Sequence, residues 1–351
     1  MKIAHVLWNL GTGGIQTMLV DIANIQCQSN DVAVMVVDAY IHESIVEKMD
    51  SKIAIYRCNR LNGEKSILPI LKLNLFLWRF KPDIIHVHMP GMAKFLFVPY
   101  PKVYTYHSTR LPTKEHFRYK RNFAISESVQ KEVASKGLDI VRVDNGIDCD
   151  SYCNRKKPFF ADGAIHAVQV SRLVQKKGQD LVLEALNLLS KKTGTEALSK
   201  KLHVHFVGDG PLLDYLKNQV KVMALEKIVS FEGFKDAQWV KEHLCDFDLF
   251  LQPSRFEGFG LTVAEAMASK VPVIVSDNEG PMEIISNGRY GIFFKNESVE
   301  SLAATLREFI EKGMKQNIIE DAYQYVRKVY DVKRTASQYL KQYSSVIKKE
   351  R

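Results

Sequence analysis

Residues 253–265 read Pro-Ser-Arg-Phe-Glu-Gly-Phe-Gly-Leu-Thr-Val-Ala-Glu. The apolar run at 247–251 before this stretch is typical of a buried strand, and residues 261–269 after it have helical composition. The residues from Glu257 to Gly260 are therefore predicted to form a turn between a strand and the N-terminus of a helix. Such a turn suits a bound phosphate, because the first N–H groups of a helix are unpaired and glycine lets a ligand approach closely.

Two carboxylates flank this turn. Glu257 precedes the glycines, and Glu265 follows eight positions later in the predicted helix. Acidic side chains suit hydroxyl groups rather than phosphates, so together they would fit a sugar beside a bound diphosphate. For either glutamate alone, the simpler explanation is a favourable charge near the helix start or a solvated helix position.

With its strand-turn-helix context, the Glu-x7-Glu spacing resembles the motif of the retaining glycosyltransferases of family 4. That family has the GT-B fold, an α/β architecture in which two Rossmann-like parallel-sheet domains face each other across a cleft. The resemblance covers nearly the whole chain. It implies transfer of a hexose from a nucleoside diphosphate sugar to an acceptor hydroxyl, with retention of the anomeric configuration and with domain closure excluding water.

The length and composition set the broad class. A chain of 351 residues predicts two domains of ordinary size. No apolar run reaches the roughly 18 to 20 residues that a membrane span needs, and residues 3–8 are too short for a signal peptide. Five scattered cysteines indicate neither a metal site nor a disulfide framework, so Cys149 and Cys153 are expected to be inert thiols in a reducing cytoplasm.

Alternating apolar runs and helical patterns predict βαβ units and parallel sheets. Strands are expected at residues 3–8, 32–37, 53–56, 84–88, 103–106, 123–125 and 140–143, and then at 164–170, 204–207, 229–231, 249–251 and 273–276. Helices are expected near 178–190, 212–222 and 298–312. We therefore assign residues 1–150 to an acceptor-binding domain and 151–331 to a nucleotide-sugar-binding domain, with a turn-rich linker at 144–158. The resemblance adds a final helix, within 332–351, that crosses back to the first domain.

The positive charge is concentrated in the first half of the chain. The net charge is +9, and residues 52–121 contain 14 Lys and Arg but only three acidic residues. Such a surface could attract nucleic acid, an anionic membrane or a phosphorylated acceptor. Because the first domain of the family receives the acceptor, we favour a glycan or lipid-linked acceptor, with peripheral contact at the inner face of the plasma membrane. Arg118, Lys120 and Arg121 are the residues expected to make that contact.

Ligands of open parallel sheets bind beyond the carboxyl ends of the strands. Gly13 and Gly14 lie in a glycine-rich loop, residues 11–14, after the first strand, where backbone amides could approach a diphosphate. The loop lacks a full dinucleotide fingerprint, because that pattern requires glycine where this chain has Gln16. Family 4 enzymes usually carry Glu at this same position, so an acceptor contact by that glutamate is in doubt here.

Cations follow the first strand of the second domain. Arg172 can bind phosphate oxygens with its guanidinium fork, and Lys177 adds a point charge. An isolated basic loop would more often be a solvated surface, but in family 4 residues at these positions neutralise the leaving diphosphate without a divalent metal or another cofactor. The triplets at 148–150 and 246–248 resemble an Asp-x-Asp metal signature of another glycosyltransferase fold, and we interpret both as structural.

Histidines end two strands of the first domain. His107 matches the Thr-x-His loop that lies near the donor sugar in the family, although a strand-end histidine is more often a structural residue. We assign His86 and His88 to packing or to support of that loop. Ser126 is interpreted as a helix N-cap. The loops at 207–211 and 231–234 resemble family loops that frame the nucleotide base.

The candidate residues divide into two sets. The expected catalytic residues are Glu257, His107, Arg172 and Lys177. The expected donor-binding residues are Gly13, Gly14, Arg172, Lys177, Gly208, Phe234, Glu257, Gly258, Phe259, Gly260, Leu261, Thr262 and Glu265.

Other functions are compatible with parts of this pattern. A nucleotide-sugar 2-epimerase would share the architecture but needs an acid/base set that the first domain offers only through its histidines. A non-catalytic two-lobed sugar-binding protein, a glycosidase with paired carboxylates and a nucleic-acid-binding protein using the basic aromatic segment 107–121 are the further alternatives. UDP is the favoured donor nucleotide, and the oligomeric state is open.

Overall fold

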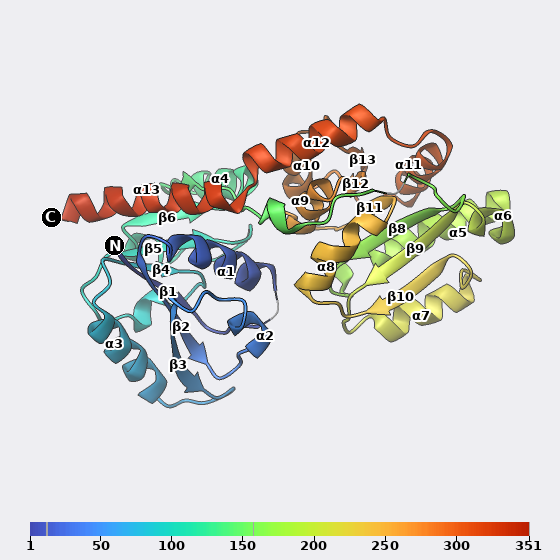
Figure 1. The fold of residues 1–351 in the computed structure, drawn as a ribbon. Coiled ribbons are helices and arrows are strands. Elements are labelled where there is room, and N and C mark those ends of the chain that lie inside the picture. Colours follow the sequence, from blue (N-terminus) through green and yellow to red (C-terminus); the bar gives the residue numbers. More distant parts are fainter. Residues whose placement is uncertain (12, 157, 351) are drawn as a thin grey trace. The chain divides into compact units, whose positions relative to one another are not determined.

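The computed structural model describes residues 1–11, 13–156 and 158–350 and shows two compact α/β units (Figure 1). Unit 1 comprises Met1–Asp148 and Tyr330–Arg351, and unit 2 comprises Cys149–Val329. Both contain a sheet in which every strand pair is parallel. The expected fold class is thereby confirmed. None of the helices described has the length and apolar character needed to span a bilayer.

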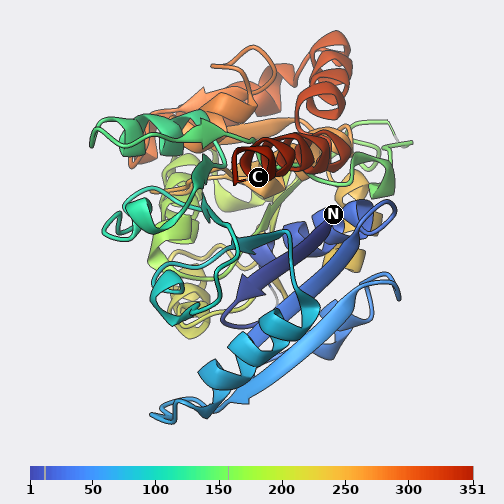
Figure 2. The ribbon, with the colours of Figure 1, turned by 90° about the vertical axis from the view of Figure 1, so that its left-hand side faces the viewer.

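Unit 1 contains a seven-stranded sheet in the order β3-β2-β1-β4-β5-β6-β7. Its strands are β1 (Lys2–Leu7), β2 (Asp31–Asp38), β3 (Ala54–Arg60), β4 (Ile84–Val87), β5 (Lys102–Tyr106), β6 (Arg121–Ala124) and β7 (Val141–Arg142). Its helices are α1 (Gly14–Gln26), α2 (Glu43–Val46), α3 (Leu68–Phe80), α4 (Glu127–Ala134) and α13 (Val332–Glu350). Figure 2 shows α3 lying along the strands β2 and β3, with which it is in contact.

Unit 2 contains a six-stranded sheet in the order β10-β9-β8-β11-β12-β13. Its strands are β8 (Ile165–Val170), β9 (Leu202–Val207), β10 (Val229–Gly233), β11 (Leu249–Gln252), β12 (Val273–Ser276) and β13 (Ile292–Phe294). Its helices are α5 (Gln179–Thr193), α6 (Thr195–Ser199), α7 (Leu213–Val222), α8 (Ala237–His243), α9 (Leu261–Ala268), α10 (Glu279–Ile284), α11 (Val299–Lys312) and α12 (Gln316–Val329).

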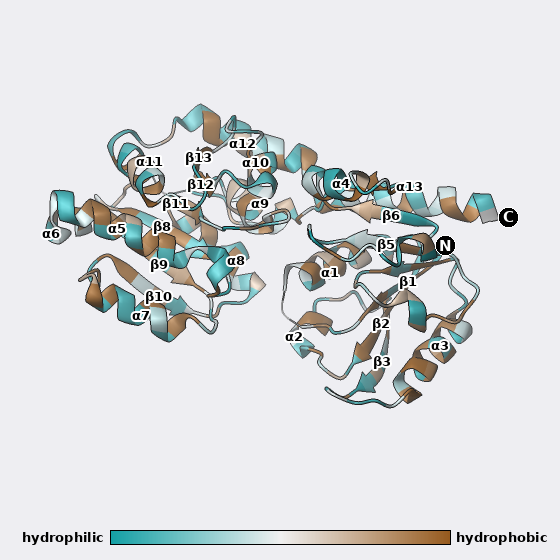
Figure 3. Cartoon of the chain, turned by 180° about the vertical axis from the view of Figure 1, so that it is seen from behind, coloured by the Kyte–Doolittle hydropathy of each residue, from teal (hydrophilic) through white to brown (hydrophobic). Residues whose placement is uncertain are grey.

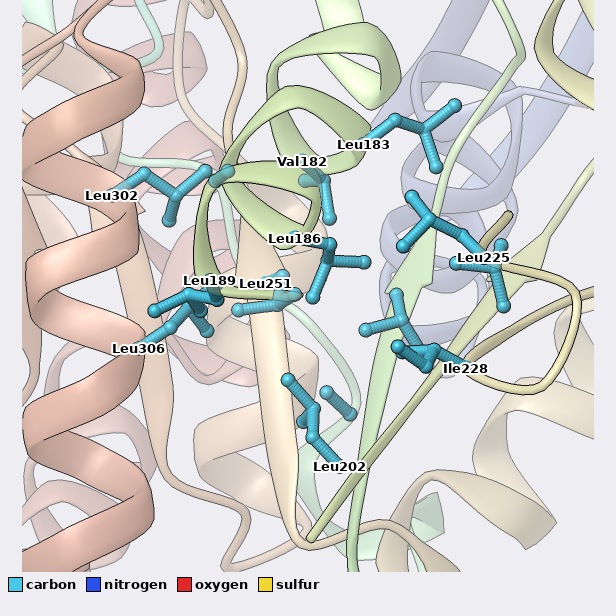
Figure 4. Close-up of a cluster of buried hydrophobic side chains, with 14 of the residues drawn as sticks. Val182, Leu183, Leu186, Leu189, Leu202, Leu225, Ile228, Leu251, Leu302 and Leu306 are labelled. Atoms are coloured by element: carbon cyan, nitrogen blue, oxygen red, sulfur yellow. The ribbon is translucent and has the colours of Figure 1, made fainter. Parts of the chain in front are cut away.

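Each unit has its own hydrophobic core. In unit 1, α1 and α13 cover one face of the sheet, and Tyr339 and Tyr343 of α13 are fully buried there. In unit 2, α5 and α11 pack on the strands β8, β9 and β11, where Leu186, Leu251 and Leu306 meet (Figure 4). The core of unit 1 therefore depends on the last helix of the chain, whereas unit 2 is built from one continuous segment.

The strand order of both sheets reverses once. In unit 1 the chain moves from β1 outward to β3 and then returns to place β4 on the other side of β1. In unit 2 the same happens between β8 and β11. The loops after these central strands diverge to opposite faces of the sheet, which leaves a crevice at the carboxyl ends where ligands of open α/β sheets bind. Most candidate site residues follow β1, β8 or β11, whereas His107, Gly208 and Phe234 follow β5, β9 and β10.

Several local predictions can be compared with the structure. The hydroxyl of Ser126 accepts a hydrogen bond from the Val129 amide at the start of α4, so the N-cap prediction is confirmed. The expectation of inert thiols was wrong for Cys153, which forms a disulfide with Cys245. The two cysteines are 92 positions apart, and only the packing of residue 153 against the end of α8 brings them together. Cys149 is a buried free thiol.

Candidate functional site

The loops after β8 and β11 meet at the switch point of the unit 2 sheet. Gly178, at the end of the first loop, has a φ of +71°. A Cβ atom at this position would lie 2.0 Å from the carbonyl oxygen of Pro253 in the second loop. Only glycine fits here, because any side chain would collide with backbone and the left-handed conformation is costly for other residues. The close approach of the two loops brings their side chains together.

Lys177 and Glu257 form an ion pair where these loops meet. Their side chains are 18% and 20% exposed, so solvent still reaches both groups. Gln252, buried at the end of β11, donates from Nε2 to the same carboxylate oxygen of Glu257 at 3.2 Å. The Thr262 hydroxyl in turn donates to Oε1 of Gln252 at 3.3 Å. One hydrogen-bonded network thus links a cation, a carboxylate and a hydroxyl at the carboxyl ends of β8 and β11.

Arg255, in the β11 loop, is hydrogen-bonded to the β8 loop and to the start of α5. Its guanidinium donates two hydrogen bonds of 2.8 Å to the carboxylate of Asp180 and one of 2.7 Å to the carbonyl oxygen of Gln175. Its backbone amide donates to the carbonyl oxygen of Lys176 at 2.9 Å. The hydrogen bonds to Asp180 raise the pKa of Arg255 further above its ordinary value. Sequence reasoning missed this bracing residue, because its partner lies 75 positions away.

Arg172 lies in the same β8 loop, and its side chain is exposed. Its backbone oxygen is fixed by a hydrogen bond of 3.0 Å from Nε2 of Gln179. Within the described parts of the chain its guanidinium has no hydrogen-bond or ion-pair partner. Arg172 is therefore a free cation on the loop that also carries Lys177, and anions bind to such groups by charge-assisted hydrogen bonds.

The turn before α9 has the expected form. Gly260 precedes the first helical residue, Leu261, with a φ of +100°. Gly258 and Phe259 are buried, so the Phe259 side chain belongs to the core and only its backbone could face a ligand. A Cβ on Gly280 of α10 would lie 2.8 Å from the amide nitrogen of Phe259, which shows how closely α10 supports the turn.

Glu265 and Thr262 lie further along α9, and both are half-buried. Thr262 is in the first turn of the helix and belongs to the network described above. The backbone oxygen of Glu265 accepts hydrogen bonds near the helix end. The first turn of α9 contains no acidic residue, so the positive end of the helix dipole is not offset there.

The loops after β9 and β10 adjoin the β8 loop. Gly208 donates its amide to the carbonyl oxygen of Gly233 at 2.8 Å. A Cβ on Gly208 would lie 1.9 Å from the carbonyl oxygen of Ser171, so this glycine allows the loops to approach. Phe234 is 57% exposed and presents an apolar ring at the same edge of the sheet.

In unit 1, the glycine-rich loop leads into α1. Gly13 is the N-cap residue and Gly14 the first residue of the helix, whereas Thr12 lies outside the described residues. Gln16 is buried and donates from Nε2 to Oδ1 of Asn9 at 3.3 Å. The predicted backbone platform is thus at the start of a 13-residue helix, beyond the carboxyl end of β1.

His107 follows β5 directly. Its Nε2 atom lies 3.2 Å from Nδ1 of His88, and its Nδ1 atom is buried and has no hydrogen-bond partner among the described residues. Burial lowers the pKa of His107 to about 3, so the ring is neutral at physiological pH. His86 does not support this loop directly, because its ring nitrogens contact Tyr343 and Thr105 in the core.

The acidic triplets have structural partners. Asp248 is 4% exposed and forms an ion pair with Arg155 at 2.6 Å, and its oxygens also accept two backbone amides. Asp150 forms an ion pair with Arg327. The first contact holds residue 155 against the residue that precedes β11, and the second joins the start of unit 2 to α12, so Asp248 and Asp150 have structural partners.

Comparison with known protein families agrees with this arrangement. Residues 12–151 match the family model described as Glycosyltransferase Family 4, and residues 153–325 match the model described as Glycosyl transferases group 1. The chain belongs to glycosyltransferase family 4. The two models meet close to the point where unit 1 passes into unit 2.

Individual relatives are distant. The mannosylfructose-phosphate synthase of Agrobacterium fabrum is 33% identical over 39% of this chain and 31% of its own length, so the match spans about a third of that protein. A Bacillus subtilis protein, TuaC, is 26% identical over 76% of this chain and 72% of its own, and its name assigns it to teichuronic acid biosynthesis. HepE of Anabaena, solved in complex with UDP, superposes with a TM-score of 0.81 at 20% identity, covering 98% of this chain and 100% of that one. The last likeness shows the GT-B fold.

Proposed function

We propose that this protein transfers a hexose from a nucleoside diphosphate sugar, with UDP as the favoured nucleotide, to a hydroxyl of a glycan or lipid-linked acceptor. Membership of family 4 supports transfer of a sugar. The observation that carries the donor assignment is the ion pair of Lys177 with Glu257 at the switch point of unit 2, four residues before the N-terminus of α9. Arg172 lies on the same loop as Lys177 and has an exposed side chain. The name of TuaC supports a role in the synthesis of a cell-surface polysaccharide.

The chemistry follows from the charges. As the bond to the sugar breaks, negative charge grows on the departing diphosphate and positive charge on the anomeric carbon. Lys177, Arg172 and the backbone amides at the N-terminus of α9 stabilise the negative charge on the diphosphate, which is the electrostatic contribution that dominates many enzymes. Glu257 binds hydroxyl groups of the sugar, and Glu265 binds those of the ribose.

Without a ligand, the Lys177 ammonium is neutralised by Glu257. A bound donor offers phosphate to the lysine and hydroxyl groups to the glutamate, so each partner exchanges an ion pair for a contact with substrate. Gln252 stays hydrogen-bonded to Glu257 during this exchange and keeps the carboxylate in place. Because both loops are braced through Arg255, little reorganisation is needed on binding.

We further propose that the transfer retains the anomeric configuration and needs no divalent metal, since the cations of the β8 loop take the place of one. Proton NMR of the product made with UDP-glucose would show the configuration of the new bond directly.

Calorimetry with UDP and UDP-glucose tests the donor site. An absence of binding heat with every nucleoside diphosphate sugar, on folded protein, would refute the assignment. Epimerised free donor as the product would favour the epimerase instead.

The exposed face of α3 supports contact with an anionic membrane surface. Leu68, Leu71, Leu75 and Trp78 are between 43% and 69% exposed, and their spacing places them on one side of the helix. We call these four residues the α3 ridge. Figure 3 shows α3 as a largely apolar helix. Its opposite side, with Leu73 and Leu77, is fully buried.

The positive charges around the α3 ridge indicate that its partner is an anionic surface. From residue 65 to residue 82 the chain contains four basic residues and no acidic one: Lys65, Lys72, Arg79 and Lys81. Apolar side chains with a tryptophan, flanked by cations, are typical of helices that lie in the membrane interface, and each basic residue near an anionic surface adds about 1 kcal/mol. Elsewhere in unit 1, Arg118 is a second exposed cation beside an exposed apolar ring, that of Phe117, which is 77% exposed.

A vesicle flotation experiment tests this contact. We expect the protein to bind phosphatidylglycerol vesicles and the double variant Leu75→Glu, Trp78→Glu to bind at least tenfold less, because burying each apolar side chain is worth about 1.5–3 kcal/mol. Phe293→Glu, which changes an apolar residue of β13 that is 47% exposed, is the matched control. A double variant that floats like the wild type, or a ridge that instead holds two copies of the chain together, would contradict the proposal.

A further inference from the structure

Unit 1 contains a group of four histidines that the proposed reaction does not explain. His5 lies in β1, His86 in β4, and His88 and His107 directly follow β4 and β5. His5 is paired with His86 in the sheet register, and both project to the face that α13 covers. Three of the rings are completely or almost completely buried, at 0 to 2% exposure. Four imidazoles in one core are unusual, because histidine is polar and a purely apolar side chain would pack at lower cost.

Three of these rings form one continuous chain of hydrogen bonds with Gln26. Oε1 of Gln26, at the end of α1, lies 2.8 Å from Nε2 of His5. Nδ1 of His5 lies 3.0 Å from Nε2 of His88, and Nδ1 of His88 lies 3.2 Å from Nε2 of His107. The chain ends at Nδ1 of His107, the buried atom that has no partner within the described residues.

A neutral imidazole has one N–H donor and one acceptor nitrogen. A chain of neutral rings can therefore be polarised in only two ways, with every proton on Nε2 or every proton on Nδ1. With the Gln26 amide oriented as in this structure, its oxygen accepts from Nε2 of His5, so that nitrogen carries the proton; the reversed amide would donate and place every proton on Nδ1. Nδ1 of His5 is then an acceptor, and the same assignment passes through His88 to His107.

The rings are neutral for a physical reason. Burial lowers the pKa of His5 to about 4 and that of His107 to about 3, and it lowers the pKa of His88 well below its ordinary value. His5 and His88 then each donate one hydrogen bond and accept one, His107 donates one to His88, and no lone pair faces another lone pair. Adding a proton anywhere along the chain would break this alternation.

We propose that Gln26, His5 and His88 are positioning residues that hold His107 as the Nε2–H tautomer. Nδ1 of His107 is thereby an obligatory hydrogen-bond acceptor at the carboxyl end of β5, and it selects a ligand group that donates a hydrogen bond there. On the basis of the proposed function, that group is a hydroxyl of the sugar or of the acceptor. A group that can only accept, such as an ether oxygen, is disfavoured at this point.

A bound metal ion is the rival explanation, because nitrogens of His5, His86 and His88 lie within 4.8 Å of one another. A metal needs an unprotonated nitrogen from each ring directed at one point. All six ring nitrogens already have a partner: those of His86 lie 2.5 Å from the Tyr343 hydroxyl and 2.7 Å from that of Thr105, and the other four belong to the chain. Hydrogen bonding accounts for the cluster completely.

Long-range proton–nitrogen NMR of the imidazole rings tests the proposal without any substrate. We expect His107 to show the Nε2–H tautomer at pH 7. His88→Asn and His88→Gln form a matched pair of variants, because the Asn amide reaches the position of Nδ1 and the Gln amide that of Nε2. Only His88→Asn can still accept from His107, so it should keep the wild-type tautomer, whereas His88→Gln should lose it.

Turnover provides the second measurement. His88→Gln should lower kcat about tenfold, the loss of one hydrogen bond of about 1.4 kcal/mol, with His88→Asn rescuing most of it. Affinity for UDP should stay unchanged in both, since the candidate diphosphate site belongs to unit 2. An Nδ1–H tautomer in the wild type, identical spectra for the two variants, or one tightly bound zinc per chain would each overturn the inference. The NMR spectra need no sugar donor. They therefore test the tautomer of His107 even if calorimetry refutes the proposed transferase activity.

Discussion

Replacement of Lys177 by Met is the sharpest test of the donor site. The ammonium group contacts Glu257 and lies at the meeting point of the β8 and β11 loops, 18% exposed. A hydrogen bond from a charged donor to phosphate is worth about 1.5–3 kcal/mol, so we expect UDP to bind about 10- to 150-fold more weakly. The effect on kcat should be larger, about 100- to 1,000-fold, because the lysine meets additional negative charge as the diphosphate departs.

The same variant should remain folded. A partly exposed ion pair contributes about 1 kcal/mol or less to the free energy of unfolding. Glu257 also keeps its hydrogen bond from Gln252 after the lysine is removed. We therefore expect thermal unfolding to shift by only about 2–4 °C, so that lost binding cannot be ascribed to lost structure.

Isothermal calorimetry with UDP and a steady-state assay with UDP-glucose are the measurements. Lys176→Met is the matched control, because it removes the neighbouring positive charge from a side chain that is exposed to solvent. If the Lys177 and Lys176 variants weaken UDP binding equally, the loop attracts the nucleotide only through its overall positive charge. Wild-type affinity and turnover in Lys177→Met would refute the reasoning altogether.

Three further variants test other parts of the structure. Gly178→Ala should destabilise the protein by more than the roughly 1–3 kcal/mol of backbone strain, because its Cβ also meets the oxygen of Pro253 at 2.0 Å; urea unfolding measures this. Phe234→Ala should weaken UDP by about 1 kcal/mol or more if the exposed ring stacks on the base, while pyrophosphate binding, measured by calorimetry, stays unchanged. His5 binds a proton in the unfolded chain below about pH 6.5 but in the folded protein only near pH 4, so unfolding should become easier as the pH falls through this window. Urea titrations at pH 7 and pH 5 should show a smaller difference for His5→Gln than for the wild type.

The sequence predicted most elements because their patterns are local. Most expected strands appear within a few residues of their predicted bounds, since each combines β-branched residues with flanking turns. The strand β13 was missed because Ile292–Phe294 is only three residues long and lies at the sheet edge. The helix α12 was not predicted, although Ile319, Ala322 and Val326 form a buried stripe at helical spacing, which is a periodic signal in the sequence.

Contacts between distant residues lay beyond local patterns. The motif at 253–265 drew attention to Glu257, but not to Gln252 and Arg255, which orient its loop through partners far along the chain. The disulfide of Cys153 is the same kind of contact. His5 did leave a trace in the sequence, because it is the only polar residue inside an otherwise apolar first strand after Lys2. Its contacts with Gln26 and His88 became visible only in the folded structure.

The position of α13 determines the order in which the protein can be completed during synthesis. Tyr339 and Tyr343 fill the core of unit 1, although they leave the ribosome after all of unit 2. Unit 2 can therefore finish folding while the first 148 residues still expose the surface that this helix will cover. A premature stop after residue 329 would therefore leave unit 2 complete but would deprive unit 1, which is synthesised first, of part of its core.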